Sequence, residues 1–144
     1  MAGFFDGEGS INISVRKRKH FSVEHMLTIA IGQKDGKTLD WIKDTFGGNI
    51  HLVKRDGSYF WYCSNKTAYN TLKKIYPFLQ YKKTQAEIAF KFYDERGIKH
   101  SPVQQKELDR RESMRQELKR LHKTIIKSQY AGTTTKRVNS KEMQ

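Results

Sequence analysis

The residues with the clearest chemical potential lie near the start of the chain, where two carboxylates are separated by a glycine. Residues 2–11 read Ala-Gly-Phe-Phe-Asp-Gly-Glu-Gly-Ser-Ile, so Asp6 and Glu8 follow an apolar run and precede alternating polar and apolar residues. Gly7 and Gly9 allow the backbone to leave a helix and turn sharply, because glycine adopts positive φ without steric cost. A carboxylate held at such a junction suits a metal ligand, since carboxylate oxygens are hard donors.

The composition favours a polyanionic partner. The 144 residues include 28 Lys+Arg against 15 Asp+Glu, which gives a formal net charge of +13. Nucleic acid is the commonest partner of such a chain, and an anionic membrane surface is the competing one. No apolar stretch is long enough to span a membrane. Cys63 is the single cysteine, so no intrachain disulfide can form, and we expect an intracellular, reducing location such as phage-infected or bacterial cytoplasm or an organelle.

Hydrophobic periodicity predicts an α+β domain over residues 1–97. A strand pattern of period two covers residues 10–15, with Ile11, Ile13 and Val15 on one face, and further strands are expected over about 21–33, 49–54 and 58–64. Asp56-Gly57 predicts a hairpin between the last two. Helices are expected over 37–46, 67–75 and 83–93, the first ended by Gly47-Gly48. The predicted order is α-β-β-α-β-β-α-α, with four antiparallel strands and helices on one side.

Residues 98–144 form a basic helical extension in this prediction. A charged helix is expected over about 103–127, and the segment after Gly132 is expected to be flexible. The basic end either binds phosphates or keeps the chain soluble. A thin apolar stripe runs along the helix and comprises Leu108, Met114, Leu118, Leu121 and Ile125.

The opening motif, residues 2–10, closely resembles the signature helix of LAGLIDADG homing endonucleases. Further matches at suitable spacing occur at residues 31–34, 46–50, 77–79 and 82–86, so the resemblance covers roughly residues 1–93. The elements after the motif are similar to one complete half of that fold. Met1 stands where the family usually has a leucine, so we expect either that the given sequence begins inside the motif of a longer helix or that Met1 begins a minimal first helix. Glu8 replaces the more familiar aspartate, a variant that the family tolerates.

The resemblance implies a metal-dependent endonuclease that cuts both DNA strands within a long recognition site. The final acid of the motif is Glu8, and the Gly7 carbonyl is the expected second metal contact. Mg²⁺ is the implied ion, and Mn²⁺ or Ca²⁺ can substitute for binding. Lys82 matches a lysine that the family places near the active site, where it balances charge or organises the attacking water. Asp35 aligns with a polar position near the metals, although Lys34-Asp35-Gly36 is also an ordinary turn before a helix.

The sequence contains one copy of the motif and no internal repeat. One carboxylate can serve the cleavage of one DNA strand. The resemblance therefore implies a homodimer in which the signature helices of two copies pack through their small residues. A two-fold symmetric protein predicts a palindromic or pseudo-palindromic target. The expected interface residues are Ala2, Gly3, Phe5 and Asp6.

We expect the sheet face opposite the apolar strand residues to read double-stranded DNA in the major groove. Arginine donates to guanine and asparagine pairs with adenine. Trp61 and Cys63 are expected to point inward, and Met26, Ala30 and Gly32 to contribute shape. The base-contact candidates are Asn12, Ser14, Arg16, Arg18, Thr28, His51, Val53, Arg55, Phe60 and Tyr62. The phosphate-contact candidates are Lys17, Lys19, Lys34, Lys37 and Lys54.

Two other functions are compatible with the same fold. An intron maturase would bind RNA, and the aromatic fourth strand and basic tail suit stacking and backbone contacts. A DNA-binding regulator built on an inactive nuclease domain is the other alternative. Intact Glu8 favours the nuclease, because binding alone does not need that carboxylate.

Overall fold

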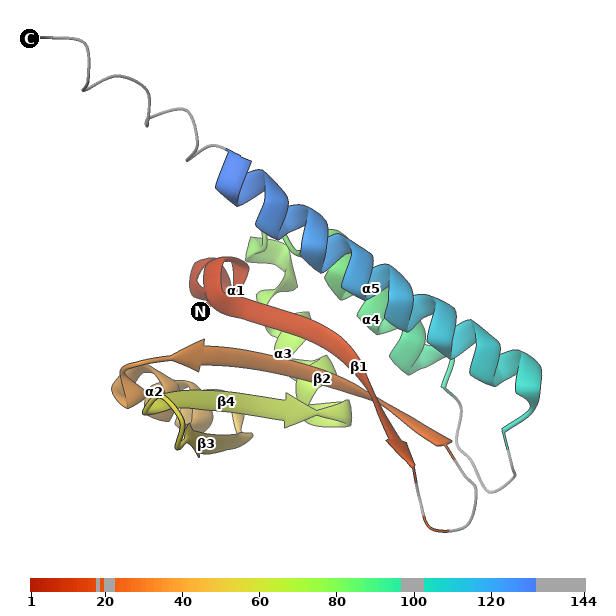
Figure 1. Ribbon diagram of the computed structural model, residues 1–144, viewed down its shortest axis with the longest axis horizontal. Helices are drawn as coiled ribbons and strands as arrows, with labels where there is room; N and C mark the ends of the chain where they lie inside the picture. The colour runs from red at the N-terminus through yellow and green to blue at the C-terminus, as the bar shows by residue number, and fades with distance from the viewer. Residues whose placement is uncertain (18, 20–22, 97–102, 132–144) are drawn as a thin grey trace, which may run out of the picture.

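The computed structural model describes residues 1–17, 19, 23–96 and 103–131 (Figure 1). Arg18, part of the first hairpin loop, Pro102 and the segment after Ala131 lie outside the described residues. The elements are α1 (Ala2–Glu8), β1 (Gly9–Lys17), β2 (Val23–Gln33), α2 (Gly36–Phe46), β3 (Asn49–Val53), β4 (Ser58–Ser64), α3 (Asn65–Ile75), the 3₁₀ helix η1 (Tyr76–Phe78), α4 (Lys83–Asp94) and α5 (Gln105–Ala131).

The predicted order of elements is confirmed, most boundaries shift by one or two residues, and α3 and α5 show the clearest differences. α3 begins at Asn65 rather than residue 67, because the chain passes from β4 directly into the helix through Ser64. Asn65 adopts φ 51°, a conformation that asparagine tolerates better than most residues. α5 continues to Ala131, four residues beyond its predicted end.

The four strands form one antiparallel sheet in the order β1-β2-β4-β3. In the first hairpin Gly9 pairs with Ile31 and Asn12 with Thr28. β2 then pairs with β4, where Thr28 lies opposite Ser64. The register is continuous across the sheet, so residues that lie opposite one another on neighbouring strands form rows on one face.

The inner face of the sheet carries the apolar residues that the alternation predicts. Trp61 and Cys63 are buried, as expected, and so are Ile11 and Ile13 of β1 and Leu27, Ile29 and Ile31 of β2. α3 and α4 cover this face, and α5 lies along α4 on the same side (Figure 1). Val15, the last apolar residue of β1, is exposed.

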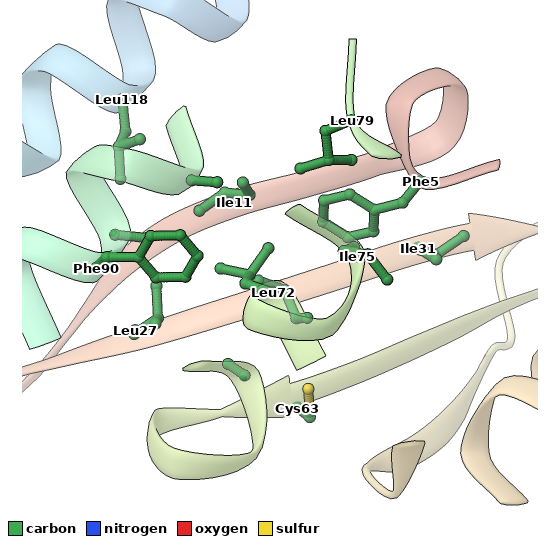
Figure 2. Close-up of a cluster of buried hydrophobic side chains, with 14 of the residues drawn as sticks. Phe5, Ile11, Leu27, Ile31, Cys63, Leu72, Ile75, Leu79, Phe90 and Leu118 are labelled. Carbon is green, nitrogen blue, oxygen red and sulfur yellow. The ribbon is translucent and has the colours of Figure 1, made fainter. Parts of the chain in front are cut away.

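The core reaches from the first helix to the last. Figure 2 shows Phe5 entering the buried cluster from α1 and Leu118 entering it from α5. Full burial of a side chain of this size contributes roughly 1.5–3 kcal/mol. Both helices are therefore part of the domain's packing, although α5 lies beyond the residues whose sequence motifs resemble those of the endonucleases.

The Gly47-Gly48 stop after α2 is confirmed and has a packing reason. The Trp61 indole N–H donates to the Gly47 carbonyl at 2.9 Å. Gly48 has φ +94°, and a Cβ there would lie 2.7 Å from the carbonyl oxygen of Tyr62. The close approach of this turn to β4 therefore requires glycine at position 48.

α5 attaches to the domain through charged contacts as well as its apolar stripe. Arg111 is buried, and its guanidinium donates to Glu107 at 2.8 Å and to the Arg96 carbonyl at 3.1 Å. Arg110 pairs with Glu95 at the end of α4 and with Glu107. These contacts fix the first turns of α5 against the end of α4.

His25 lies on the inner face of β2, against α5. The side chain is 4% exposed, and Nε2 lies 3.6 Å from the Glu112 carboxylate. Burial lowers the pKa of His25 below its ordinary value of 6.5, because a charged imidazole loses hydration there. The positive charges of Arg111 and Arg115 lower the pKa further, whereas Glu112 raises it.

This environment predicts a pH dependence of folding. Since the folded state disfavours protonated His25, the unfolded state binds more protons once the pH falls to about 6.5. We expect the free energy of unfolding in urea to decrease between pH 7.5 and 5.5, and His25→Gln to reduce this decrease. His51→Gln, which changes an exposed histidine, should leave it unaltered. Equal pH slopes for wild type and His25→Gln would contradict the prediction.

Candidate active site and nucleic-acid interface

α1 divides its residues between the core and an open surface. Phe5 and Asp6 are buried, whereas Gly3, Gly7 and Glu8 are exposed. A Cβ added at Gly3 or Gly7 would meet no atom within 4 Å. These two glycines are four residues apart and lie on one face of the helix. The face is therefore open to another helix, as the dimer prediction requires, while Phe5 packs inside its own subunit.

The Asp6 carboxylate binds the backbone at the start of α4. It accepts hydrogen bonds from the amides of Gln80 at 2.6 Å, Tyr81 at 3.2 Å and Lys82 at 3.0 Å. Gln80 and Tyr81 precede α4 and Lys82 is its N-cap, so none of these amides has an intrahelical acceptor and a buried carboxylate is a suitable partner. The predicted interface role of Asp6 thus does not use its side chain, which is committed within the subunit.

Lys82 lies behind the exposed acid. Its side chain is 3% exposed, and Nζ donates to the backbone carbonyl of Asp6. Burial lowers the pKa of Lys82, and the charges of Asp6 and Glu8 oppose this shift. The predicted pairing of this lysine with the motif therefore has a structural basis: both acids lie close enough to act on its charge.

Glu8 is the last residue of α1, and its side chain is exposed. Gly9 follows at the start of β1, where a Cβ would lie 2.5 Å from the Phe5 ring, so the helix-to-strand junction requires glycine. The hard oxygen donors expected to bind metal, the Glu8 carboxylate and the Gly7 carbonyl, thus lie together at an exposed helix end. Among the described residues, no group of three or more His, Cys, Asp or Glu side chains is placed to hold a metal ion.

Asp35 has a structural role. It is the N-cap of α2, and its carboxylate accepts a hydrogen bond from the Lys37 amide at 3.0 Å. This is the ordinary turn that the sequence allowed as an alternative to a catalytic role. A direct role of Asp35 at the metal stays a prediction.

The outer face of the sheet brings most base-contact candidates together. The register aligns Asn12 with Thr28, and His51 with Phe60. Phe60 and Tyr62 point outward, as predicted, and are 40% and 36% exposed. The candidates on this face are Asn12, Ser14, Arg16, Thr28, His51, Val53, Phe60 and Tyr62.

Most predicted phosphate contacts lie around this face rather than on it. Lys17 is the last residue of β1 and alternates to the side opposite Arg16. The other phosphate-contact candidates are exposed and lie in turns or at the start of α2, and they are Lys19, Lys34, Lys37 and Lys54. Arg55, predicted as a base contact of the third strand, lies in the turn after β3 and not on the sheet face. Arg18 lies outside the described residues. These cations therefore lie around the outer face, whose centre is neutral among the described residues.

Three polar residues beside these candidates were missed. Ser64 and Asn49 lie on the outer face, opposite Thr28 and Tyr62 respectively. Gln33 ends β2 two residues beyond Ile31, the partner of Gly9, and so belongs to the end of the sheet that carries α1. Extending the strand alternation to the terminal residues of β3 and β4 would have found Asn49 and Ser64, whereas Gln33 alternates to the inner face and is found only from the paired structure.

Comparison with known proteins identifies the family. The profile of the LAGLIDADG endonuclease family matches residues 1–98. The chain belongs to this family. The resemblance seen in the signature motif is therefore confirmed, and the matched region ends just beyond α4.

Two relatives of the chain are a DNA endonuclease and an RNA maturase. The DNA endonuclease I-CreI of Chlamydomonas reinhardtii is 31% identical over 109 residues, which cover 71% of this chain and 66% of that protein. The intron-encoded RNA maturase bI4 of Saccharomyces cerevisiae is 32% identical over 95 residues, which cover 63% of this chain but 15% of the maturase. The chain thus spans only part of either relative.

Solved LAGLIDADG structures share the fold. The homing endonuclease I-CvuI, crystallised with the I-CreI target and Mg, superposes with a TM-score of 0.71 at 22% identity, covering 83% of this chain and 78% of that one. The archaeal intron-encoded homing endonuclease I-Vdi141I, complexed with DNA, superposes with a TM-score of 0.70 at 23% identity. The superposition covers 83% of this chain and 80% of that one. The predicted α+β LAGLIDADG architecture is confirmed. No described helix is long and apolar enough to cross a membrane.

The Asp6 contacts predict a stability effect. Asp6→Asn keeps the size of the side chain but replaces one acceptor oxygen with a donor, which would face backbone amides. We expect the free energy of unfolding to fall by about 1–3 kcal/mol, measured in urea. Asp40→Asn, a matched change of an exposed carboxylate on α2, should change it by less than about 0.5 kcal/mol. Similar losses in the two variants would contradict the assigned role.

Proposed function

We propose that this chain is a divalent-metal-dependent, site-specific DNA endonuclease that acts as a homodimer on a palindromic or pseudo-palindromic site. The observation that carries the proposal is the position of buried Lys82, which is hydrogen-bonded to the Asp6 carbonyl and within electrostatic reach of exposed Glu8 at the open end of α1. A domain that only binds DNA has no need of a cation buried behind an exposed carboxylate. The similarity to I-CreI supports the DNA substrate.

The donor chemistry at the end of α1 fits a hard divalent ion. Glu8 offers a carboxylate and Gly7 a backbone carbonyl, and both residues are exposed. Mg²⁺ prefers such oxygen ligands and completes its coordination with water and substrate phosphate. When bound, the ion supplies Lewis-acid stabilisation of the phosphate and lowers the pKa of a coordinated water. The crystal of I-CvuI with Mg is consistent with this choice.

The chain's own residues prepare this site in three ways. Asp6 fixes the position of α1 relative to α4 through its three amide contacts. Lys82 adds a positive charge that is shielded from water and lies within electrostatic reach of Asp6 and Glu8. The Lys82 ammonium also places positive potential where an attacked phosphate gains negative charge.

The glycine face of α1 supports a two-fold assembly. Two copies that pack Gly3 and Gly7 against each other can bring their helix backbones close together. Each copy would then present its own Glu8 to one DNA strand. An isologous contact of this kind places the two sheets symmetrically, so a symmetric target follows.

A second candidate function, that of an RNA maturase, has support from two observations. The chain is 32% identical to part of a yeast RNA maturase, and Phe60 and Tyr62 expose a pair of rings 6.5 Å apart on the sheet. Exposed aromatic side chains on a sheet can stack with unpaired RNA bases. Maturase activity could coexist with cleavage in one chain, and cleavage assays test the endonuclease alone.

Glu8→Gln should abolish most cleavage while retaining binding. The amide removes the charge that a metal needs, and loss of one such electrostatic group costs on the order of 10²–10³ in rate. The measurement is single-turnover cleavage of a duplex selected from a genomic or random library with Mg²⁺. Asp40→Asn is the control, because it changes an exposed carboxylate on α2 that belongs to none of the candidate sites. Full activity of Glu8→Gln would refute the proposed mechanism.

Gly3→Leu should separate the two subunits. A leucine at this open position leaves the monomer undisturbed but blocks close approach of a second α1. We expect sedimentation to show a loss of dimer at micromolar concentration, and plasmid cleavage to lose its double-strand product. Thr38→Leu places the same side chain at an exposed position of α2 and should preserve both. An unchanged dimer in Gly3→Leu would place the interface elsewhere.

A further inference from the structure

The outer sheet face is neutral at its centre. From β1 to β3 its central rows are Ser10–Ala30–Tyr62–Asn49 and Asn12–Thr28–Ser64, and Gly32, Phe60 and His51 form the row next to the α1 end. Within the described strands, Arg16 is the one Arg or Lys on this face, and it lies opposite Glu24 at the far end. The bidentate donors that usually identify guanine are therefore missing from the described centre.

The chemistry that does lie at the centre suits A·T base pairs. The Asn12 amide can pair with both N6 and N7 of adenine. The hydroxyls of Ser14, Thr28 and Ser64 contact one another at 3.1 Å and 3.4 Å, and hydroxyls do not discriminate strongly between bases. Amide and hydroxyl groups alone thus favour adenine over guanine.

The aromatic pair supplies an apolar contact. The rings of Phe60 and Tyr62 are tilted by 32° and lie beside the small residues Gly32 and Ala30. A Cβ on Gly32 would approach the Phe60 ring to 3.6 Å, so the ring borders the surface of the central strand. In the major groove, the exposed apolar group of a base pair is the 5-methyl of thymine, and phenylalanine is a suitable partner for it.

We propose that this face selects A·T-rich sequence, with thymine 5-methyl groups packing on Phe60 and Tyr62. This inference rests on the proposed binding of double-stranded DNA and names the sequence class that the sheet reads. Arg16 and the cations around the face hold phosphates or distal bases. Replacing thymine with uracil removes the methyl group and retains every hydrogen-bonding atom, so the substitution isolates the proposed contact.

The first experiment selects duplexes from a randomised library by binding in Ca²⁺, followed by binding measurements on the selected duplex. We expect A·T pairs to be enriched where the sheet contacts each half-site. Substitution of a contacted thymine with deoxyuridine should weaken binding about fourfold, the factor expected for one buried methyl group. Enrichment of G·C pairs at these positions, or equal affinity for thymine and deoxyuridine duplexes, would overturn the inference.

Variants connect the effect to the aromatic pair. Phe60→Ala or Tyr62→Ala should bring the ratio of the affinities for the thymine and deoxyuridine duplexes close to one. Phe60→Leu should retain most of the preference for thymine. Leu52→Ala is the matched control, since Leu52 is 45% exposed but alternates to the opposite face of the sheet. If Phe60→Ala does not fold, the proposed contact is still tested by Phe60→Leu and by the affinity of the wild-type protein for the thymine and deoxyuridine duplexes. A ratio that persists in both alanine variants would overturn the assignment.

The outcomes also separate this inference from the proposed function. Specific cleavage that is insensitive to uracil overturns the thymine contact and leaves the endonuclease standing. Binding without cleavage refutes the endonuclease, and the uracil comparison still decides the sequence class. If the chain binds no duplex, or binds a single-stranded RNA more tightly than the selected duplex through Phe60 and Tyr62, the inference fails.

Discussion

The site depends on one buried carboxylate that joins the two ends of the domain. Asp6 accepts three backbone amides from residues 80–82, and Lys82 returns a hydrogen bond to the Asp6 carbonyl. Hydrogen bonds to a charged group contribute about 1.5–3 kcal/mol each, and leaving such a group unsatisfied in the interior costs as much or more. A helix of seven residues is too short to be stable alone, so these contacts and Phe5 hold it in place.

This arrangement allows α1 to have two opposite surfaces. Its buried side provides packing and polar anchoring within the subunit, while the glycine side remains open. Because the anchoring contacts come from the same chain, the position of Glu8 relative to Lys82 does not require a partner. A second copy would therefore bring together two sites that are each already ordered. α5 supports this indirectly, since Leu118 closes the opposite side of the same core.

The sequence predicted the features that follow from local periodicity. Strand faces were correct, including Trp61 and Cys63 inward, because alternation in a half-buried strand leaves little choice. The Asp6 contacts could not be predicted, since their partners are 74–76 residues away and are backbone amides, which leave no trace in composition. Asp35 was ambiguous because a helix N-cap and a metal-site carboxylate use the same residue type. The neutral centre of the outer face was missed because overall net charge gives no information about where charges lie.

The linked hydroxyls of Ser14, Thr28 and Ser64 have a consequence for any attempt to retarget this protein. These side chains come from three adjacent strands, and each is a hydrogen-bonding partner of its neighbour. Exchanging one of them releases a donor or acceptor on the next, so preferences at adjacent positions of the site will not combine independently. A variant library that seeks a new DNA specificity should therefore randomise Ser14, Thr28 and Ser64 at the same time.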